Sequence, residues 1–464
     1  MVTCRINIVL ALLLLAVLGG RVFLKPTVVQ PDSPRYLQMG LNFADYGVLT
    51  AESYVPGGPV PKPGLALGGP FTAWEIALAA KMSDATKESF QCAAITPDYR
   101  TCDMKIVSLQ AIYVLEIFIF HMAVWFVARS VFQNDVKAWL ATGLSLVFKE
   151  SGAYVHSILS EPSHMMTVGF FFLAWLYAFA EPEKLKRWFL CGLILGFVAL
   201  VKPAWSALVP GIAVCGVLYV IWKRSEFKRV AAGVLALTAG TACISLIFLT
   251  RNVIQFGFWG LSDPTYLSLS YAYRFTYNAM NWTEWLASWI FFLPDFGDNL
   301  TKSLFGQDVV DKLGWGPDSY FIYGRDVLHS KALAASSEKT VSAYLLKNYF
   351  FNDIVKSIAV TASLMWRGLF VGNLFGLVAV ILAGPMLYCA KPKIRQALIL
   401  LLLPCLIMVG VHALVSIGIT RYSIPLIVPY ALILTQVLHV LGGEALRFVP
   451  SGLTAKIKTF LPKN

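Results

Sequence analysis

The residues best suited to chemistry lie in the segment Gln30-Pro31-Asp32-Ser33-Pro34-Arg35-Tyr36-Leu37, shortly after the first apolar run of the chain. A carboxylate at the lipid–water boundary can take a proton from a substrate hydroxyl, so Asp32 is a candidate general base. The alternative is that Asp32 or Ser33 only caps the helix that follows, with Pro34 in its first turn. The same segment contributes Arg35 and Tyr36.

Other polar side chains gather at the ends of apolar runs. Glu161 and His164 open the fourth run, and Lys202 follows the fifth. Each has an ordinary alternative role: Glu161 can stabilise a helix N-terminus through the macrodipole, and Lys202 can be a single lysine that reaches the interface. Arg251 follows the seventh run, and Arg421-Tyr422 precedes the last. Three cations beside carboxylates on one face would suit a phosphate carried at the membrane surface.

Composition places these residues in a membrane protein. Hydrophobic residues make up 57% of the 464 residues and charged residues 14%, against about 45–50% and about 25% in soluble domains. Several apolar runs reach the length that a bilayer-spanning helix needs. We expect an all-α polytopic integral membrane protein with about 10–12 transmembrane helices. The expected spans are Ile6–Val22 (uncleaved), Ile106–Val127, Ala138–Phe148, Met165–Phe179, Trp188–Val201, Ala207–Trp222, Val230–Leu249, Leu369–Tyr388, Ala397–Ile417 and Ile424–Leu441, with two more around Trp285–Leu293 and Ile354–Trp366.

Clusters of Lys and Arg predict the orientation, because they favour the cytoplasmic side. All fall on one face if both termini are cytoplasmic. The clusters are Lys184, Lys186 and Arg187; Lys223, Arg224, Lys228 and Arg229; Lys391, Lys393 and Arg395; and Arg447, Lys456, Lys458 and Lys463. The net charge of +12 then reflects topology and contact with anionic membrane lipids, and no nucleic-acid partner is expected.

Three regions follow from this topology. Residues 1–250 form an N-terminal transmembrane module with a catalytic first external loop, residues 23–105. Residues 251–368 form an external region with interfacial helices, and residues 369–464 hold the last spans and a short cytoplasmic tail. The first loop contains two amphipathic segments, Tyr36–Tyr46 and Phe71–Met82, which we expect in the membrane plane; the alternative is that both pack on a loop domain. Cys92 and Cys102 in this loop are candidates for a disulfide, and no pattern predicts a zinc site.

The order of these motifs resembles the GT-C superfamily of lipid-linked-sugar glycosyltransferases, in particular the branch of protein O-mannosyltransferases and lipid A aminoarabinose transferases. The matching motifs are Pro31-Asp32-Ser33…Tyr36-Leu37, Ser160-Glu161-Pro162, Gly192-Leu193-Ile194-Leu195-Gly196…Lys202-Pro203, Arg251-Asn252…Phe256-Gly257 and Arg421-Tyr422…Pro425…Pro429. They extend from about residue 30 to residue 430, which is most of the chain.

The resemblance implies transfer of a sugar from a polyprenyl phosphate, such as undecaprenyl phosphate, to an acceptor hydroxyl on the non-cytoplasmic face, with inversion. It implies Asp32 as the base and Lys202, Arg251 and Arg421 on the donor phosphate. Supporting or acceptor-binding roles fall to Arg35, Tyr36, Glu161, His164 and Tyr422. Several of these enzymes carry Asp-Glu where this chain has Asp32-Ser33, so a second carboxylate is missing beside the base. No cofactor is expected; without an Asp-x-Asp pattern in the external loops, a divalent metal is possible but not favoured.

Two other functions stay open. A flippase or transporter of a lipid-linked saccharide would need many spans, but such proteins place polar residues near the bilayer midplane, and here Glu116 is an exception in charge-poor spans. An oligosaccharide ligase with a polyprenyl-pyrophosphate donor would use the same outer face. The acceptor can be a glycan, a glycolipid or a protein. Short cytoplasmic loops favour a bacterial inner membrane with the active site on the periplasmic side.

Overall fold

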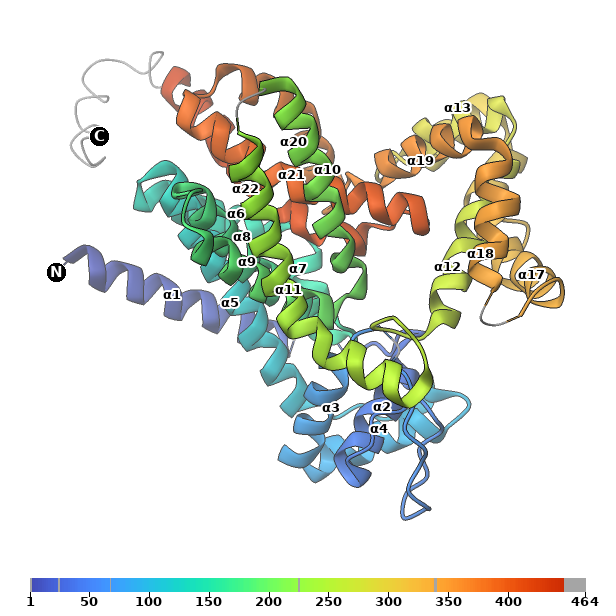
Figure 1. Ribbon diagram of the computed structural model, residues 1–464. Coiled ribbons are helices and arrows are strands. Elements are labelled where there is room, and N and C mark those ends of the chain that lie inside the picture. The colour runs from blue at the N-terminus through green and yellow to red at the C-terminus, as the bar shows by residue number, and fades with distance from the viewer. Residues whose placement is uncertain (1, 24–25, 67, 224–225, 338–339, 446–464) are drawn as a thin grey trace.

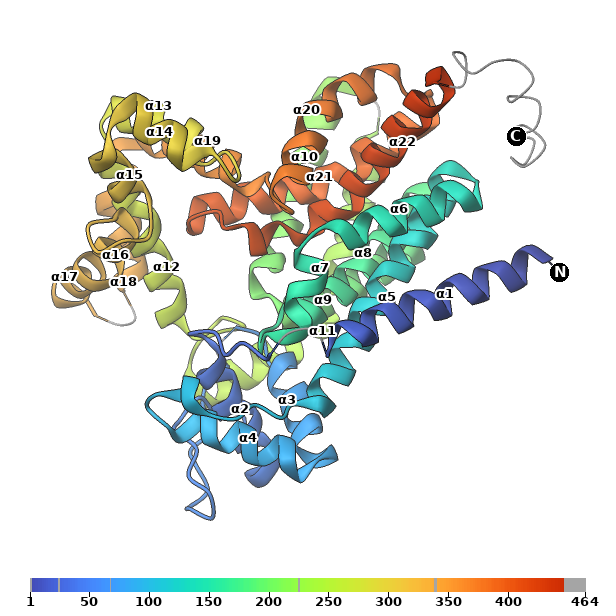
Figure 2. The same ribbon diagram turned by 180° about the vertical axis from the view of Figure 1, so that it is seen from behind.

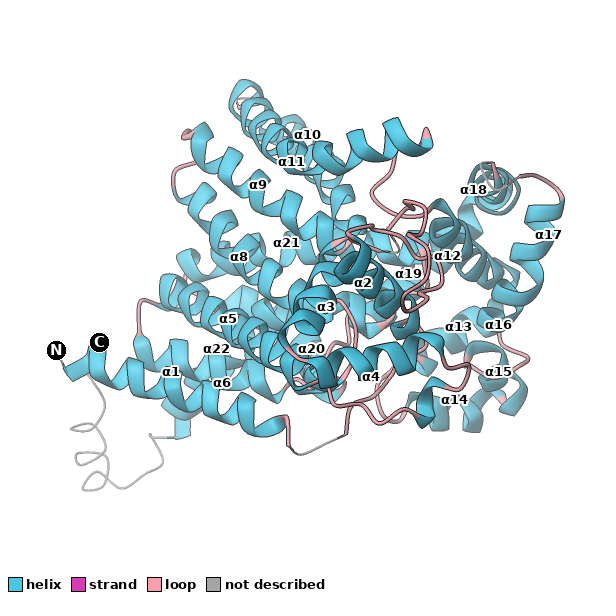
Figure 3. Ribbon diagram, turned by 90° about the horizontal axis from the view of Figure 1, so that it is seen from below, coloured by secondary structure: helices cyan, strands magenta, loops and turns pink. Residues whose placement is uncertain are grey.

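The structure, a computed structural model, describes residues 2–23, 26–66, 68–223, 226–337 and 340–445. Within these ranges the chain consists of helices and loops, with one isolated bridge between Val28 and Ser157 (Figure 3). The all-α prediction is therefore confirmed for the described part of the chain. The predicted basic residues Arg224, Arg447, Lys456, Lys458 and Lys463 lie outside the described residues.

A central bundle holds the long apolar helices (Figure 1). Six helices of the described chain are long and apolar enough to cross a membrane. They are α5 (Val107–Phe132), α8 (Glu161–Ala180), α10 (Leu208–Lys223) with the preceding turn η3 (Pro203–Ala207), α11 (Phe227–Phe256), α21 (Pro392–Val415), and α22 (Ile427–Ala445) with the preceding turn η8 (Thr420–Leu426). The other predicted spans are also helical: α1 (Val2–Arg21), α6 (Asp135–Val147), α9 (Leu185–Val201) and α20 (Leu374–Cys389).

Two short helices occupy the positions of the additional predicted spans. They are α13 (Trp282–Phe291), with 10 residues, and α19 (Ile354–Gly368), with 15 residues. At 1.5 Å per residue these helices extend about 15 and 22 Å, less than the roughly 30 Å of a hydrocarbon core. The predicted span at α6, with 13 residues, is equally short, so helix length does not decide whether α13 and α19 cross the membrane, and the two additional spans stay a prediction.

Close backbone contact joins α9 to α11. A Cβ atom on Gly192 would lie 2.1 Å from the carbonyl oxygen of Leu237, and one on Gly240 would lie 2.1 Å from that of Phe189. Only glycine permits this approach, which resembles the small-residue packing of membrane helices. The packing fixes the direction of α9, and with it the position of Lys202 at its C-terminal end.

The first external loop folds into a small lobe at one end of the bundle, made of α2 (Ser33–Tyr46), α3 (Phe71–Met82), α4 (Asp84–Ile95) and η1 (Tyr99–Thr101). Leu37 and Leu41 of α2 are buried in the core of this lobe. By contrast, Leu78 and Met82 of α3 are 53% and 60% exposed. The apolar residues of α2 therefore pack within the lobe. In α3 the ring of Trp74 packs on Phe248 of α11, and Leu78 and Met82 are left exposed.

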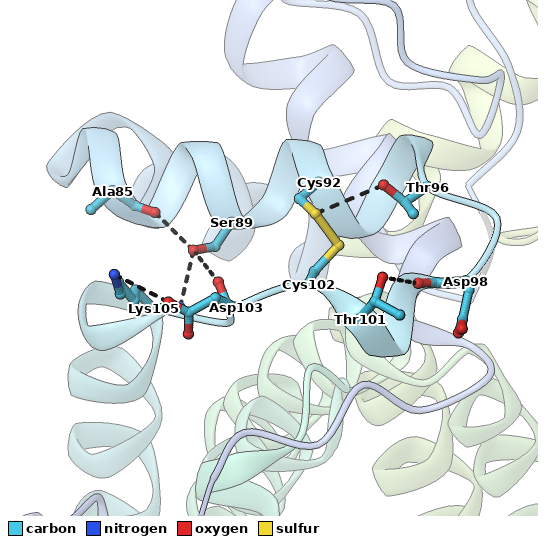
Figure 4. The surroundings of a disulfide bond; sticks show 9 residues. All are labelled: Ala85, Ser89, Cys92, Thr96, Asp98, Thr101, Cys102, Asp103 and Lys105. Carbon is cyan, nitrogen blue, oxygen red and sulfur yellow. Dashed lines mark hydrogen bonds and ion pairs between the residues drawn. A yellow bond between two sulfur atoms is a disulfide. The ribbon is translucent and has the colours of Figure 1, made fainter.

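A disulfide between Cys92 and Cys102 closes this lobe (Figure 4). It joins the last turns of α4 to the segment that leads into α5. Next to it, the hydroxyl of Ser89 donates to the backbone oxygens of Ala85 and Asp103. The position of α5 relative to α4 is thus fixed by a covalent bond and by hydrogen bonds.

The region after α11 forms a second lobe, which Figure 2 shows apart from the first. Its arginine Arg274 is fully buried and donates to the carbonyl oxygens of Ser357 and Ala413, both at 2.8 Å. These bonds attach the lobe to the end of α21.

The helices of the second lobe besides α13 and α19 are α12 (Pro264–Thr276), η4 (Tyr277–Ala279), α14 (Gly297–Phe305), α15 (Gln307–Leu313), α16 (Tyr320–Tyr323), η5 (Gly324–Leu328), α17 (His329–Ala334), α18 (Val341–Leu345), η6 (Leu346–Phe350) and η7 (Phe351–Asp353). Outside this lobe, α7 (Glu150–Ala153) and η2 (Tyr154–His156) precede α8.

Candidate active site

A cavity of about 370 Å³ lies where the ends of several bundle helices meet the first lobe. Its walls come from the start of α2, the start of α8, the end of α9, η3, the loop after α11, α12, the end of α21 and η8. The polar residues that line it include Asp32, Tyr36, Glu161, Lys202, Asp263, Tyr266, His412, Arg421 and Tyr422. They come from helix ends that are far apart in the sequence, so tertiary packing brings them together.

Asp32 and Arg421 form an ion pair in this cavity. Both terminal nitrogens of Arg421 lie 3.2 Å from Oδ2 of Asp32, and the two side chains are 28–29% exposed. Asp32 occupies the N-cap position of α2, but its side chain makes no capping hydrogen bond. The capping alternative does not describe Asp32, because its carboxylate is directed to Arg421 instead.

Ser33 makes the local bonds that hold the start of α2. Its hydroxyl accepts from the backbone N–H of Gln30 and donates to the carbonyl oxygen of Ile158, both at 2.9 Å. The second bond ties α2 to the segment just before α8. Ser33, which stands where a second carboxylate was expected, therefore bonds to Ile158 and helps to position Asp32.

A second ion pair joins Glu161 to Lys202 across the cavity wall. Oε1 of Glu161 lies 2.8 Å from Nζ of Lys202, and the two side chains are 1% and 16% exposed. Burial lowers the pKa of Lys202, but Glu161 and Tyr36 outweigh this effect and hold its pKa above the ordinary value. Lys202 is therefore a fixed positive charge, and not a lysine that reaches into solvent.

Aromatic side chains complete the wall. Burial raises the pKa of Tyr36, Lys202 partly opposes this, and Tyr36 keeps its proton. The ring of His412 stacks on that of Tyr422 with centroids 4.4 Å apart and planes at 13°. Nζ of Lys202 lies 5.9 Å from the Tyr422 ring centre. Sequence reasoning missed His412; its position in the last turn of α21, shortly before Arg421-Tyr422, was the available signal.

Three predicted site residues lie elsewhere. The guanidinium of Arg251 donates to the carbonyl oxygens of Leu49 and Gly64, at 3.3 and 2.9 Å, and does not line the cavity. Arg35 is exposed. His164 is buried behind the wall, with its ring 5.6 Å from that of Trp205 in an edge-on arrangement. Arg251 holds the first external loop against α11, so its placement gives a phosphate-binding role no support.

A buried acidic group lies next to this site and was also missed. Both carboxylate oxygens of Glu75 are within 2.6–2.7 Å of the Ser163 hydroxyl, and Glu116 is adjacent. Burial raises the pKa of Glu75, and hydrogen bonds from its neighbours only partly oppose this. Ser163 is two residues after Glu161, so this contact fixes α3 to the start of α8.

No group of three or more His, Cys, Asp or Glu side chains that could hold a metal ion occurs among the described residues. This finding leaves the metal dependence of the chain as a prediction.

No protein-family model and no curated protein sequence matches the chain. Solved structures with similar folds include the archaeal oligosaccharyltransferase AglB from Archaeoglobus fulgidus, in complex with an inhibitory peptide and a dolichol-phosphate, with 15% identity and a TM-score of 0.48. That alignment covers 98% of this chain and 52% of AglB, so this chain spans about half its length. ArnT from Cupriavidus metallidurans, bound to undecaprenyl phosphate, aligns over 96% of this chain and 81% of its own, with 14% identity and a TM-score of 0.38. At these values the likenesses assign no function.

Proposed function

We propose that this chain is a membrane glycosyltransferase that moves a sugar from a polyprenyl phosphate to an acceptor hydroxyl of a glycolipid, a polysaccharide or a protein. The observation that supports the proposal is the pair of ion pairs, Asp32–Arg421 and Glu161–Lys202, around one cavity at the ends of apolar helices. Together they supply a carboxylate base and two cations, which are the groups that such a transfer needs.

In the proposed reaction Asp32 takes the proton of the acceptor hydroxyl while its oxygen attacks the anomeric carbon. The new carbon–oxygen bond forms as the bond from the anomeric carbon to the phosphate oxygen breaks. Polyprenyl phosphate leaves with both electrons of that bond. Attack from the face opposite the leaving phosphate inverts the anomeric centre.

The charges of the two ion pairs fit this change. One negative charge disappears from Asp32 as it takes the proton, and one appears on the leaving phosphate. Arg421, which contacts Asp32 before the reaction, is then free to bind that phosphate. Lys202 stays charged through its contact with Glu161 and stabilises the same oxygens.

Other lining residues have supporting roles in this proposal. The protonated hydroxyl of Tyr36 is a hydrogen-bond donor beside Asp32 and Lys202, and Tyr422 and His412 form a flat wall for the sugar or the acceptor. We place the cavity on the periplasmic side of a bacterial inner membrane. Lys and Arg collect at the starts of α9, α11 and α21, and these helix starts lie away from the cavity. Because such residues favour the cytoplasmic side of a membrane, they support this orientation.

The proposal is tested by release of free polyprenyl phosphate. Purified protein in liposomes receives a panel of polyprenyl-phosphate sugars and a cell-envelope extract, and the released carrier is quantified. A glycosyltransferase releases polyprenyl phosphate only with a suitable donor and acceptor, and the productive donor identifies the sugar.

The same assay separates the open alternatives. An oligosaccharide ligase releases the pyrophosphate form of the carrier, and a flippase releases neither form but moves the donor between leaflets. Either outcome would refute the proposed transfer.

A further inference from the structure

A second cavity, of about 430 Å³, lies in the bundle between α8, α9, α10, α11 and α21. Its walls are mainly apolar; they include Trp175, Phe179, Trp188, Val230, Val234 and Leu403. A cavity with such walls does not hold water stably. In a bilayer, a hydrocarbon chain is the natural occupant of such a space.

Two of the walls face the surroundings of the protein. Only 17% of the apolar window of the α10 segment and 28% of that of α11 are buried within the protein. Because both helices are apolar, their exposed surfaces contact lipid in a membrane. A lipid chain can therefore reach the cavity directly from the bilayer.

One edge of the cavity is polar. It includes Arg229, whose guanidinium lies 3.6 Å from the Glu226 carboxylate and whose side chain is 49% exposed. The neighbouring Lys228 is exposed, as is Lys186 at the start of α9, whereas Lys184 pairs with Glu181. An apolar chamber with a cationic edge matches a molecule with an acyl chain and a negatively charged headgroup.

This cavity is far from the candidate active site. Gln396 of α21 lines the second cavity, and Val411 of the same helix lines the first. Leu403, at the near end of the second cavity, is eight residues or about 12 Å from Val411, and Gln396 at its far end is fifteen residues or about 22 Å away. The two cavities therefore lie at different depths, and the second faces the leaflet opposite to the active site.

We propose that the second cavity binds an anionic diacyl phospholipid, with an acyl chain between α9, α10 and α11 and the headgroup phosphate on Arg229. The bound lipid would fill the space beside the α9–α11 contact and stabilise the helix that carries Lys202. The proposal is independent of the enzymatic function, because it depends on the second cavity alone.

The test is native mass spectrometry of the purified full chain with added phosphatidylglycerol, phosphatidylcholine or polyprenyl phosphate. The variant Gly233→Leu fills the cavity: a Cβ at Gly233 lies at an ordinary 3.5 Å from Trp188, so the rest of the side chain extends into the cavity. The control is Gly143→Leu in α6, since a Cβ at Gly143 has nothing within 4 Å. Both are glycines in helices, so the cost of the change in the helix is matched.

We expect the wild-type chain and Gly143→Leu to retain one phosphatidylglycerol in preference to phosphatidylcholine, and Gly233→Leu to bind it at least about tenfold more weakly. Arg229→Gln, which keeps the cavity, should reduce the preference for the anionic lipid. Equal binding by Gly233→Leu and Gly143→Leu would overturn the proposal. So would equal retention of both phospholipids by the wild type, or occupancy of this site by polyprenyl phosphate instead.

Discussion

Arg421 and Lys202 differ in how easily each can separate from its carboxylate partner. Lys202 is paired with a carboxylate that is 1% exposed, whereas Arg421 is paired with one that is 29% exposed and lines the cavity. Separating a buried ion pair costs far more than separating a partly exposed one. We therefore expect Lys202 to act as a fixed charge and Arg421 to exchange Asp32 for a phosphate during the reaction.

The Glu161–Lys202 pair leads to a prediction about stability. Lys202→Met leaves the buried Glu161 carboxylate without its cation, and we expect a loss of about 3–5 kcal/mol in the free energy of unfolding. The double variant Glu161→Gln/Lys202→Met should recover much of this loss, because no charge is then left unpaired. Thermal unfolding in detergent measures both; additive losses in the double variant would contradict the pairing.

Glu75 leads to a prediction about pH. Burial raises its pKa in the folded chain above the ordinary carboxyl value, so the folded state binds its proton more tightly than the unfolded state does. This contribution to stability is complete below the ordinary carboxyl pKa and is lost as the pH rises through the raised value. Glu75→Gln should weaken the fall in melting temperature over this range. An unchanged pH slope in Glu75→Gln would be evidence against a protonated Glu75.

The elements that carry these residues are positioned by contacts that leave no spare space. Gly69 of the first lobe lies against the end of α9, where an added Cβ would be 1.7 Å from the carbonyl oxygen of Leu200. This contact is two residues from Lys202. The lobe and the bundle therefore meet directly at the candidate active site, and the shape of one determines the shape of the other.

We expect Gly69→Ala to displace the lobe from α9 and to lower the turnover rate by about a factor of 10²; misplacement by about 1 Å is enough for that loss. Gly143→Ala in α6, where a Cβ has nothing within 4 Å, is the matched control and should retain full turnover. Equal activities of the two variants would show that this contact does not position the site.

The disulfide between Cys92 and Cys102 is expected to stabilise the first lobe. Cys92→Ser should reduce the stability of the first lobe by about 2–3 kcal/mol, as expected for a bond that closes a short loop. Proteolysis of the native protein between α4 and α5, followed over time, measures the loosening. Identical digestion rates with and without the bond would argue against a stabilising role.

The helices were predictable from the sequence to a useful degree, because apolar runs and flanking charges reflect local properties. Ile106–Val127 was expected and α5 extends from Val107 to Phe132. The orientation of α2 was not predictable. Its apolar residues could pack in the core of the lobe or contact lipid, and only the contact with α3 determines which. A Cβ at Gly40, for example, would lie 2.2 Å from Ile76, a contact that no local pattern reveals.

In the whole molecule, the candidate active site lies at one end of the bundle. Its cavity is lined by the starts of α8 and α12, the ends of α9 and α21, the turn η8 before α22, and Asp32 and Tyr36 of the first lobe. The start of α1 and the end of α22 lie on the same side of the bundle, away from that lobe (Figure 1). The sidedness of the chain in the membrane stays a prediction.

The sequence predicted only some of the residues that line the candidate active site. Asp32, Glu161, Lys202 and Arg421 were identified from their type and from their position at the ends of spans. Position in the sequence does not state how far a helix end lies from the cavity. Arg251 thus contacts loop carbonyls, whereas His412, which had no distinguishing motif, lies on the wall.

In the proposed transfer of a sugar from a polyprenyl phosphate, Asp32 is the base. The most direct test compares the wild-type chain with Asp32→Asn in liposomes, with donor binding and release of free polyprenyl phosphate measured on the same preparations. For Asp32→Asn we expect donor binding within a few-fold of the wild type and release slower by about 10²–10⁴-fold. Equal release by the two proteins would contradict it and would redirect the search for the base to Glu161.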